Sequence, residues 1–233
     1  MLSSVVSYPN RSSPTAAAGM RRLVAMIFVL WLALAFWLGA RGIFVTQRGT
    51  PPILLLLAVL IPIGAFVLGW WVSRPFRDFL LAADLRMLTA MQAWRFAGVG
   101  FIALHTHGLL PGYFAWPAGL GDVVVGVTAP WMAIALSRGS GFAGSRTFVA
   151  WTLFGIFDFA VLAVGMGAIA RLLFPGLAQT VTPQMAAAAP MRHLPLVLVP
   201  TFAVPMFTIF HFVALLQVQA LKRGNRDQKS EVS

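Results

Sequence analysis

Long apolar runs are the feature that most constrains how this chain folds. The stretch from Pro52 to Val72 contains no ionisable side chain, and about 20 such residues in a helix span the roughly 30 Å hydrocarbon core of a bilayer. Only 10% of the 233 residues are charged, whereas soluble domains contain roughly 25%. We therefore expect an all-α membrane protein in contact with the lipid bilayer.

Six runs of this kind divide the chain. We expect membrane-spanning helices at residues 23–40, 52–72, 93–110, 117–136, 148–173 and 194–221. The last run contains Pro195, Pro200 and Pro205 near its start. These prolines predict a kinked outer third, which a membrane tolerates only where protein or water covers the freed backbone groups.

The remaining segments define the domain layout. Residues 1–20 are rich in Ser, Ala, Pro and Gly and predict a disordered tail. Residues 21–222 are expected to form one six-helix transmembrane domain, and residues 223–233 a polar tail. Segment 74–92 mixes apolar and charged residues after a proline, which predicts an interfacial helix between the second and third spans.

The first apolar run also resembles a signal peptide, because the pair Arg21 and Arg22 precedes it. The run is longer than the roughly 7 to 15 apolar residues of a signal peptide, and further spans follow. We therefore expect an uncleaved membrane anchor.

Lysine and arginine are distributed unequally between the two sides of the six spans. Thirteen of the 17 lie on the side that holds both termini, and four lie on the other side: Arg41, Arg48, Arg171 and Arg192. Cytoplasmic loops carry the excess of positive charge, so both termini are expected in the cytoplasm and the Pro- and Gly-rich hairpin Leu110–Asp122 outside. The same distribution accounts for the net charge of +11 without nucleic acid, for which no recognition motif is present.

Four ionisable residues remain inside the spans once the loops are set aside: Arg95, Asp122, Asp158 and His211. A charge at the bilayer centre costs roughly 2.5 to 3.5 kcal/mol, so such groups normally pair with each other or face water. These four residues are the candidate substrate or proton path. The alternative interpretation is that they form structural hydrogen bonds that fix helix packing.

The positions of these residues along their helices predict how they meet. Asp122 shares a helix face with small residues, which turns it toward a neighbouring helix, and its place near the start of its span predicts a site near the outer surface. Asp158 and His211 are each expected near mid-membrane and in contact with one another. Arg95 is expected near the cytoplasmic side, where it reaches either water or Asp158.

The chain has no cysteine, so any metal or haem would need His, Met or carboxylate ligands. His105 and His107 lie two residues apart and therefore project about 200° apart on a helix, which does not suit one metal centre. Polar roles near the membrane surface suit them better. Two of His105, His107 and His211 would serve as axial ligands if the protein binds haem. We predict no metal site, and the sequence identifies no cofactor.

One stretch resembles a known pattern. Gln92-Ala-Trp-Arg95, Gly98, Phe101, Gly108-Leu-Leu-Pro111, Phe114-Ala, Pro117-Ala-Gly119 and Gly121-Asp122 are similar to a pattern in uncharacterised bacterial integral membrane proteins of five or six spans. This resemblance implies a location in the bacterial inner membrane. It also directs attention to Arg95 and Asp122, and implies no specific activity.

These observations favour a small-solute or proton-coupled carrier with an intramembrane Asp/His site. Two alternatives stay open: a haem-binding redox subunit and a non-catalytic membrane scaffold. An enzyme is less favoured, because no nucleophile or substrate motif accompanies the acids and histidines. The oligomeric state and any protein partner are not predicted.

Overall fold

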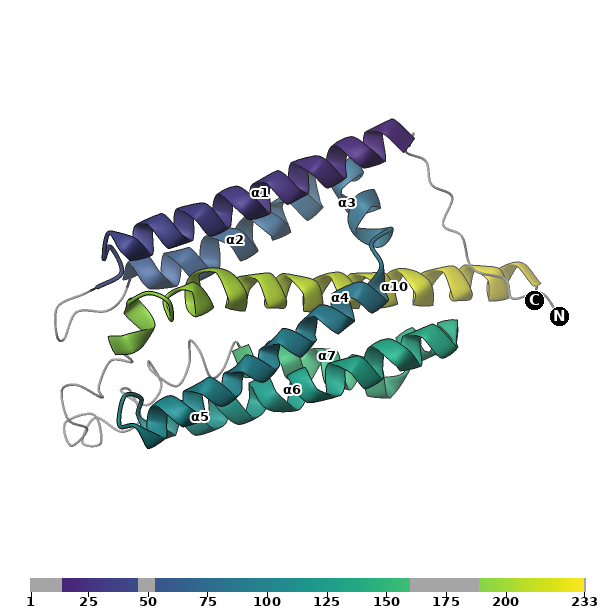
Figure 1. Ribbon diagram of the computed structural model, residues 1–233. Helices are drawn as coiled ribbons and strands as arrows, with labels where there is room; N and C mark the ends of the chain where they lie inside the picture. Colours follow the sequence, from purple (N-terminus) through teal and green to yellow (C-terminus); the bar gives the residue numbers. More distant parts are fainter. Residues whose placement is uncertain (1–13, 46–52, 160–188, 233) are drawn as a thin grey trace.

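The computed structural model describes residues 14–45, 53–159 and 189–232, and every regular element in these ranges is helical (Figure 1). The elements are α1 (Pro14–Ala40), α2 (Ile53–Val72), α3 (Arg74–Leu81), α4 (Leu85–Met91), η1 (Gln92–Gly98), α5 (Val99–Thr106), α6 (Gly112–Arg138), η2 (Ser140–Gly144), α7 (Arg146–Phe157), η4 (Ala189–Arg192), η5 (Val199–Ala203) and α10 (Val204–Val232).

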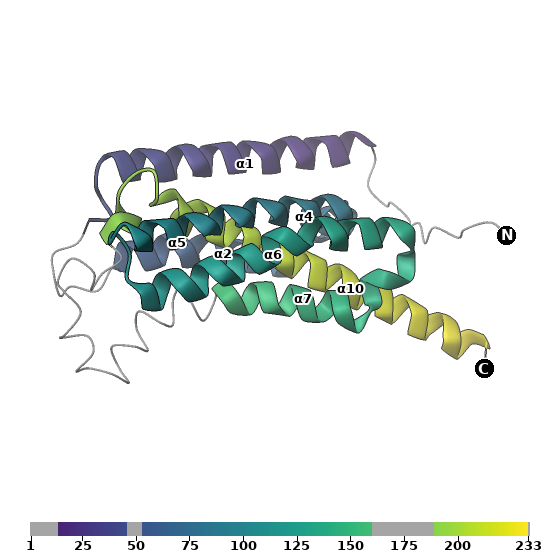
Figure 2. The same ribbon diagram turned by 60° about the horizontal axis from the view of Figure 1, so that its bottom comes forward.

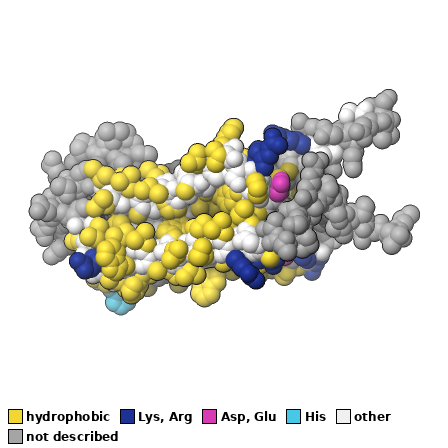
Figure 3. All heavy atoms as spheres, turned by 90° about the horizontal axis from the view of Figure 1, so that it is seen from above, with side chains coloured by type: hydrophobic (Ala, Val, Ile, Leu, Met, Phe, Trp, Pro, Cys, Tyr) yellow, Lys and Arg dark blue, Asp and Glu magenta, His cyan; other side chains and the backbone are white. Residues whose placement is uncertain are grey.

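Five helical segments are long and apolar enough to cross a membrane: Ala18–Ala40, Ile53–Val72, Leu85–Thr106, Phe114–Arg138 and Val199–Gly224. The shorter apolar helix α7 begins where the fifth expected span begins, and the rest of that span, 160–173, lies outside the described residues. Figure 3 shows one face of the molecule, on which hydrophobic side chains cover the middle and Lys and Arg lie toward the ends. In the described residues, the expected helical fold with several helices of membrane length is confirmed.

Several element boundaries differ from the expected ones. α1 begins at Pro14, so the prediction of disorder is wrong for residues 14–20, and α10 continues through the polar tail to Val232. The third span begins at Leu85, because Asp84 caps α4 and accepts hydrogen bonds from the backbone N–H groups of Arg86 at 2.9 Å and Met87 at 3.4 Å. The structure also places a short helix, α3, where the interfacial helix was expected.

The Asp84 carboxyl lies outside the membrane-length segments. Partial burial acts to raise the pKa of this group, but the hydrogen bonds from Arg86 and Met87 and the charge of Arg86 outweigh that effect. The pKa of Asp84 is therefore held below its ordinary value, which favours the charged form that caps the helix.

The hairpin between the third and fourth spans is shorter than the sequence suggested. α6 begins at Gly112 with Pro111 as its N-cap residue, so most of the stretch Leu110–Asp122 is helical. Pro117 is the sixth residue of this helix, so α6 lacks one backbone hydrogen bond there. The prediction of a hairpin that extends to Asp122 is wrong.

α10 lies at the centre of the bundle (Figures 1 and 2). It packs against α2, α3, α4 and α7, while α4, η1 and α5 follow one another along the length of α6. The Gln217 side chain of α10 donates hydrogen bonds to the carbonyls of Leu80 at 2.8 Å and Ala83 at 2.9 Å, which ties α10 to the end of α3.

The start of the last span is irregular, as the prolines predicted. η5 is a π-helical segment, and the carbonyl of Thr201 precedes Pro205 by four residues, so it lacks the usual N–H donor. The indole N–H of Trp31 on α1 donates to this carbonyl at 3.1 Å. A side chain from another helix therefore covers the freed backbone group.

Glycines allow α6 to approach the third span closely. A Cβ on Gly126 would collide with the backbone nitrogen of Phe96, and one on Gly119 would lie 3.0 Å from the carbonyl oxygen of Gly98. These positions belong to the small-residue face that the sequence predicted for Asp122. The seam between α6 and η1 therefore depends on the absence of side chains at these positions.

Gly126→Ala should destabilise the fold by about 1 to 3 kcal/mol, because the backbones of α6 and η1 must separate to admit the methyl group. Gly64→Ala on α2 is the matched control, since a Cβ there meets nothing within 4 Å. Thermal unfolding of the purified proteins in detergent should show a lower Tm for Gly126→Ala alone. Equal Tm values for the two variants would contradict the tight seam.

Candidate functional site

Arg95 occupies the middle of the third span rather than its cytoplasmic edge. The span runs from Leu85 to Thr106, so Arg95 lies about 15 Å along a helix of 1.5 Å rise per residue. Its side chain is 1% exposed. The prediction of a position near the cytoplasmic side is wrong, because the span begins eight residues earlier than the apolar pattern indicated.

The Arg95 guanidinium joins three other segments of the bundle. Its Nε donates to Oδ1 of Asp122 on α6 at 2.7 Å, and its Nη2 donates to Oδ2 of Asp158, directly after α7, at 2.5 Å. Its Nη1 donates to the carbonyl of Gly155 on α7 at 3.2 Å and lies 3.3 Å from Nε2 of His211 on α10. All three guanidinium nitrogens therefore have partners.

His211 presents a lone pair to Arg95. A guanidinium can only donate hydrogen bonds, so the facing Nε2 must accept and the proton of the neutral imidazole belongs on Nδ1. The imidazole lies edge to face with Trp151 at a centroid distance of 5.4 Å, and the guanidinium carbon lies 3.7 Å from the centroid of the Phe159 ring. The rings of Trp151 and Phe159 therefore pack directly against the polar groups.

The four residues that the sequence singled out therefore form one buried cluster, which we call the Arg95 cluster: Arg95, Asp122, Asp158 and His211. Two details of the prediction are wrong. Asp122 lies at the level of Arg95 and not near the outer surface, because α6 begins at Gly112 and places Asp122 about three turns inside. Asp158 and His211 each contact Arg95 rather than one another.

Glycines make room for the cluster, and the sequence analysis did not assign them this role. A Cβ on Gly98 would collide with Cβ of Asp122, one on Gly121 with Oδ1 of Asp158, and one on Gly155 with Nε2 of His211. The sequence spacing could have predicted this role for two of the glycines, because Gly98 follows Arg95 by three residues and Gly155 precedes Asp158 by three. Residues three apart share a helix face.

Gln92 is a further polar residue that the sequence analysis did not select. It is buried one helical turn before Arg95 and donates from Nε2 to the carbonyl of Phe207 on α10 at 3.1 Å. No partner for its Oε1 occurs in the part of the chain that the structure describes. Gln92 therefore ties η1 to α10 beside the cluster.

The Arg95 cluster holds two carboxylates against one guanidinium. With both acids ionised and His211 neutral, its net charge is −1. Within the described residues, Oδ1 of Asp158 is buried and accepts no hydrogen bond. An unpaired carboxylate oxygen in such a place costs free energy unless a proton or another cation reaches it.

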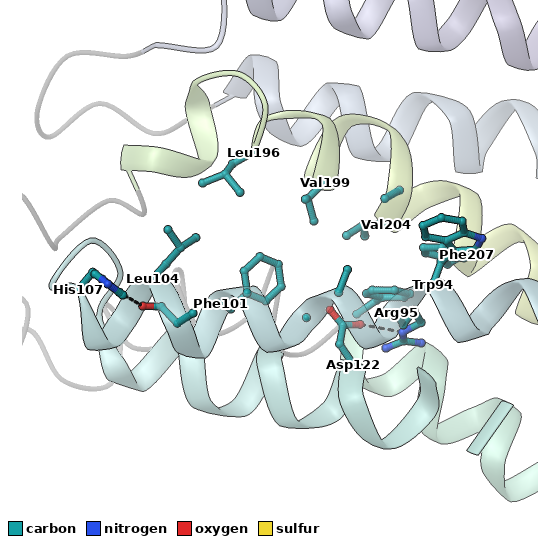
Figure 4. A pocket seen from close by; sticks show the side chains of 16 residues that line it. Trp94, Arg95, Phe101, Leu104, His107, Asp122, Leu196, Val199, Val204 and Phe207 are labelled. Atoms are coloured by element: carbon teal, nitrogen blue, oxygen red, sulfur yellow. Dashed lines mark hydrogen bonds and ion pairs between the residues drawn. The ribbon is translucent and has the colours of Figure 1, made fainter. Parts of the chain in front are cut away.

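A cavity of about 620 Å³ adjoins the cluster (Figure 4). It lies between the third span and the segment from Leu196 to Phe207, and its walls are almost wholly apolar. Arg95 and Asp122 lie at one end and His107 at the other. Asp122 is the more accessible of the two acids, with a side chain 12% exposed against 3% for Asp158.

His105 and His107 lie near the C-terminal end of α5. Nδ1 of His105 lies 2.9 Å from the carbonyl oxygen of Leu110, and Nδ1 of His107 lies 2.8 Å from that of Ala103. His211 instead faces Arg95. No group of three His, Asp or Glu residues with metal-binding geometry occurs in the described residues, and the assignment of haem ligands stays a prediction that a visible absorption spectrum tests.

Arg95→Leu should destabilise the protein by about 3 to 5 kcal/mol, because it leaves two buried carboxylates without a partner. The triple variant Arg95→Leu, Asp122→Asn, Asp158→Asn removes both charges as well and should recover part of this loss. Thermal unfolding in detergent measures the difference. A triple variant less stable than Arg95→Leu would contradict the charge network.

The Arg95 cluster and the cavity fall within the one region that matches a known family. A family model described as "Domain of unknown function (DUF8737)" matches residues 52–219, which is more than two thirds of the chain. No curated protein and no solved structure matches the chain. The protein therefore belongs to the family of this domain of unknown function, DUF8737.

Proposed function

We propose that the protein is a proton-linked membrane carrier and that the Arg95 cluster is its proton-binding site. One observation carries the proposal: two buried carboxylates share one guanidinium, and one carboxylate oxygen, Oδ1 of Asp158, accepts no hydrogen bond from any described residue. A fully ionised cluster is short of one positive charge. Uptake of one proton makes it neutral.

The surroundings of the cluster support reversible uptake. Arg95 from η1 contacts both acids, Asp122 on α6 and Asp158 at the end of α7, and His211 from α10 faces Arg95. Arg95 stabilises one ionised carboxylate, so the second is the one that binds a proton. The cavity beside Asp122 supplies a route, and His107 is the titratable group at its far end.

The proton-binding site lies where several helices meet, so a change in its charge acts on all of them. Arg95 connects α6, α7 and α10 through hydrogen bonds of 2.5 to 3.3 Å. A proton on Asp158 weakens the attraction between η1 and the end of α7, while the pair of Arg95 and Asp122 stays charged. A change of this kind at the junction of four segments gives two arrangements whose balance depends on protonation, as a carrier requires.

Acidification should produce the infrared band of a protonated carboxyl group in the purified protein in lipid, and both Asp158→Asn and Asp122→Asn should remove it. Either substitution leaves one carboxylate for one guanidinium, so the excess negative charge is gone. Asp78→Asn on the exposed side of α3 is the control and should keep the band. Persistence of the band in both cluster variants would overturn the proposal.

We further propose six spans with both termini in the cytoplasm of a bacterial cell and the helices in the inner membrane. The bias of Lys and Arg supports this topology and stays at twelve to four when Arg95 is counted inside its span. The start of α1 and the end of α10 lie at the same end of the bundle (Figure 1), as an even number of spans requires.

Single cysteines test this topology cleanly, because the chain has none of its own. In intact cells, a membrane-impermeant maleimide should label Leu109→Cys, between α5 and α6, and should not label Gly141→Cys in η2. Both positions are exposed and lie at opposite ends of α6. Permeabilised cells serve as the control, since both variants should react there. The reverse pattern would place the termini outside.

A further inference from the structure

We infer that the cavity beside the Arg95 cluster binds a hydrophobic organic cation, and that this cation and the proton compete for the cluster's excess negative charge. The inference rests on the proposed function, because it names the substrate class of the same carrier. It combines the apolar cavity wall with the carboxylate of Asp122, which is more exposed than the guanidinium of Arg95.

The wall of the cavity suits an apolar ligand. Phe101 and Leu104 line it from α5, Phe159 follows α7, and Val199 and Phe207 come from η5 and α10. The volume of about 620 Å³ lies within the range of roughly 300 to 1,000 Å³ that holds drug-sized molecules. Burial of the apolar body of such a ligand supplies the affinity.

The polar end of the cavity selects the sign of the ligand's charge. Arg95 lines the cavity, but its side chain is only 1% exposed and all three of its nitrogens already have partners. Asp122 is the more exposed group, and among the described residues only its Oδ1 takes part in a hydrogen bond, the one from Arg95. A ligand at this end therefore meets a carboxylate oxygen and not a free guanidinium.

Aromatic side chains strengthen the preference for a cation. Trp94, Phe101, Phe159 and Phe207 all line the cavity, and the faces of aromatic rings attract positive charge. An anion would be repelled by the carboxylate of Asp122 at this end of the cavity. A neutral apolar molecule would fill the volume and leave the net charge of −1 in place.

Exchange with protons follows from the same charge count. The cluster needs one positive charge to become neutral, and either a proton or a bound cation supplies it. Each therefore lowers the affinity for the other, and thermodynamic linkage makes the two effects equal. Binding of the cation therefore releases the proton from the cluster, so the carrier exchanges one for the other.

Tetraphenylphosphonium is a suitable probe, because it is apolar and its positive charge is permanent. Tetraphenylborate has nearly the same size and shape with the opposite charge. Isothermal titration of the full chain in lipid nanodiscs, with empty nanodiscs subtracted, should show saturable binding of the phosphonium and none of the borate. In weak buffer, a pH electrode should record release of close to one proton per phosphonium bound.

Two variants separate the contribution of charge from that of shape. Asp122→Asn should weaken phosphonium binding by about tenfold or more, because it removes the charge the ligand meets. Gly100→Leu should also weaken binding while the cluster stays intact, since Gly100 lines the cavity and a Cβ there meets nothing within 4 Å. Gly64→Leu on α2 is its matched control, because a Cβ there is equally unobstructed and Gly64 does not line the cavity. It should bind the probe as the unaltered protein does.

Each outcome decides between the claims. Equal binding of the two ions, or unchanged binding in Asp122→Asn, overturns the inference and indicates an uncharged occupant such as a lipid chain. If the protein binds the phosphonium and not the borate but releases no proton, the ligand class is supported and the proton linkage of the proposed function is overturned. If the infrared carboxyl band appears on acidification but the protein binds no phosphonium, the proton site is supported and the ligand class is overturned.

Discussion

The structure depends on one buried guanidinium. Arg95 lies near the middle of the membrane-length segment Leu85–Thr106 and connects Asp122, Gly155, Asp158 and His211, so the segments of the bundle that carry those residues meet around it. An arginine alone at this depth would be costly, and the two carboxylates offset that cost. The same arrangement leaves one negative charge in excess. The group that holds the helices together is therefore also the group on which the proposed proton and cation site depends.

Glycines at this site allow the helices to pack closely enough for the charged side chains to meet. The carboxylate of Asp122 reaches Arg95 because Gly98 has no side chain where Asp122 passes, and Gly126 lets α6 approach the backbone of η1. Gly155 supplies a carbonyl to Arg95 and space for His211. The small residues therefore set the distance between helices, and that distance decides whether the charged groups meet. A side chain at any of these positions would separate charges that stabilise one another only at contact.

The irregular start of the last span shapes one wall of the cavity. η5 and the residues before it form one wall, and the carbonyl of Thr201 that Pro205 leaves free is covered by Trp31 of α1. A regular helix in this place would present a different wall to Phe101 and Leu104. The prolines thus shape a hollow between the third and the last spans, and the first span compensates for the backbone hydrogen bond that they remove.

The sequence by itself determined the helical membrane fold, the residues of the cluster and the irregular last span, because hydropathy, charge and proline act locally along the chain. It also indicated the small-residue face of α6 that carries Asp122. It did not determine the depth of Arg95 or Asp122, because Asp84 and Pro111 move the starts of their helices away from the edges of the apolar runs. Only the tertiary structure decided that one arginine would join two acids and a histidine from three other segments. Such contacts depend on the register between helices, which close approach at glycines sets and which no single apolar run encodes.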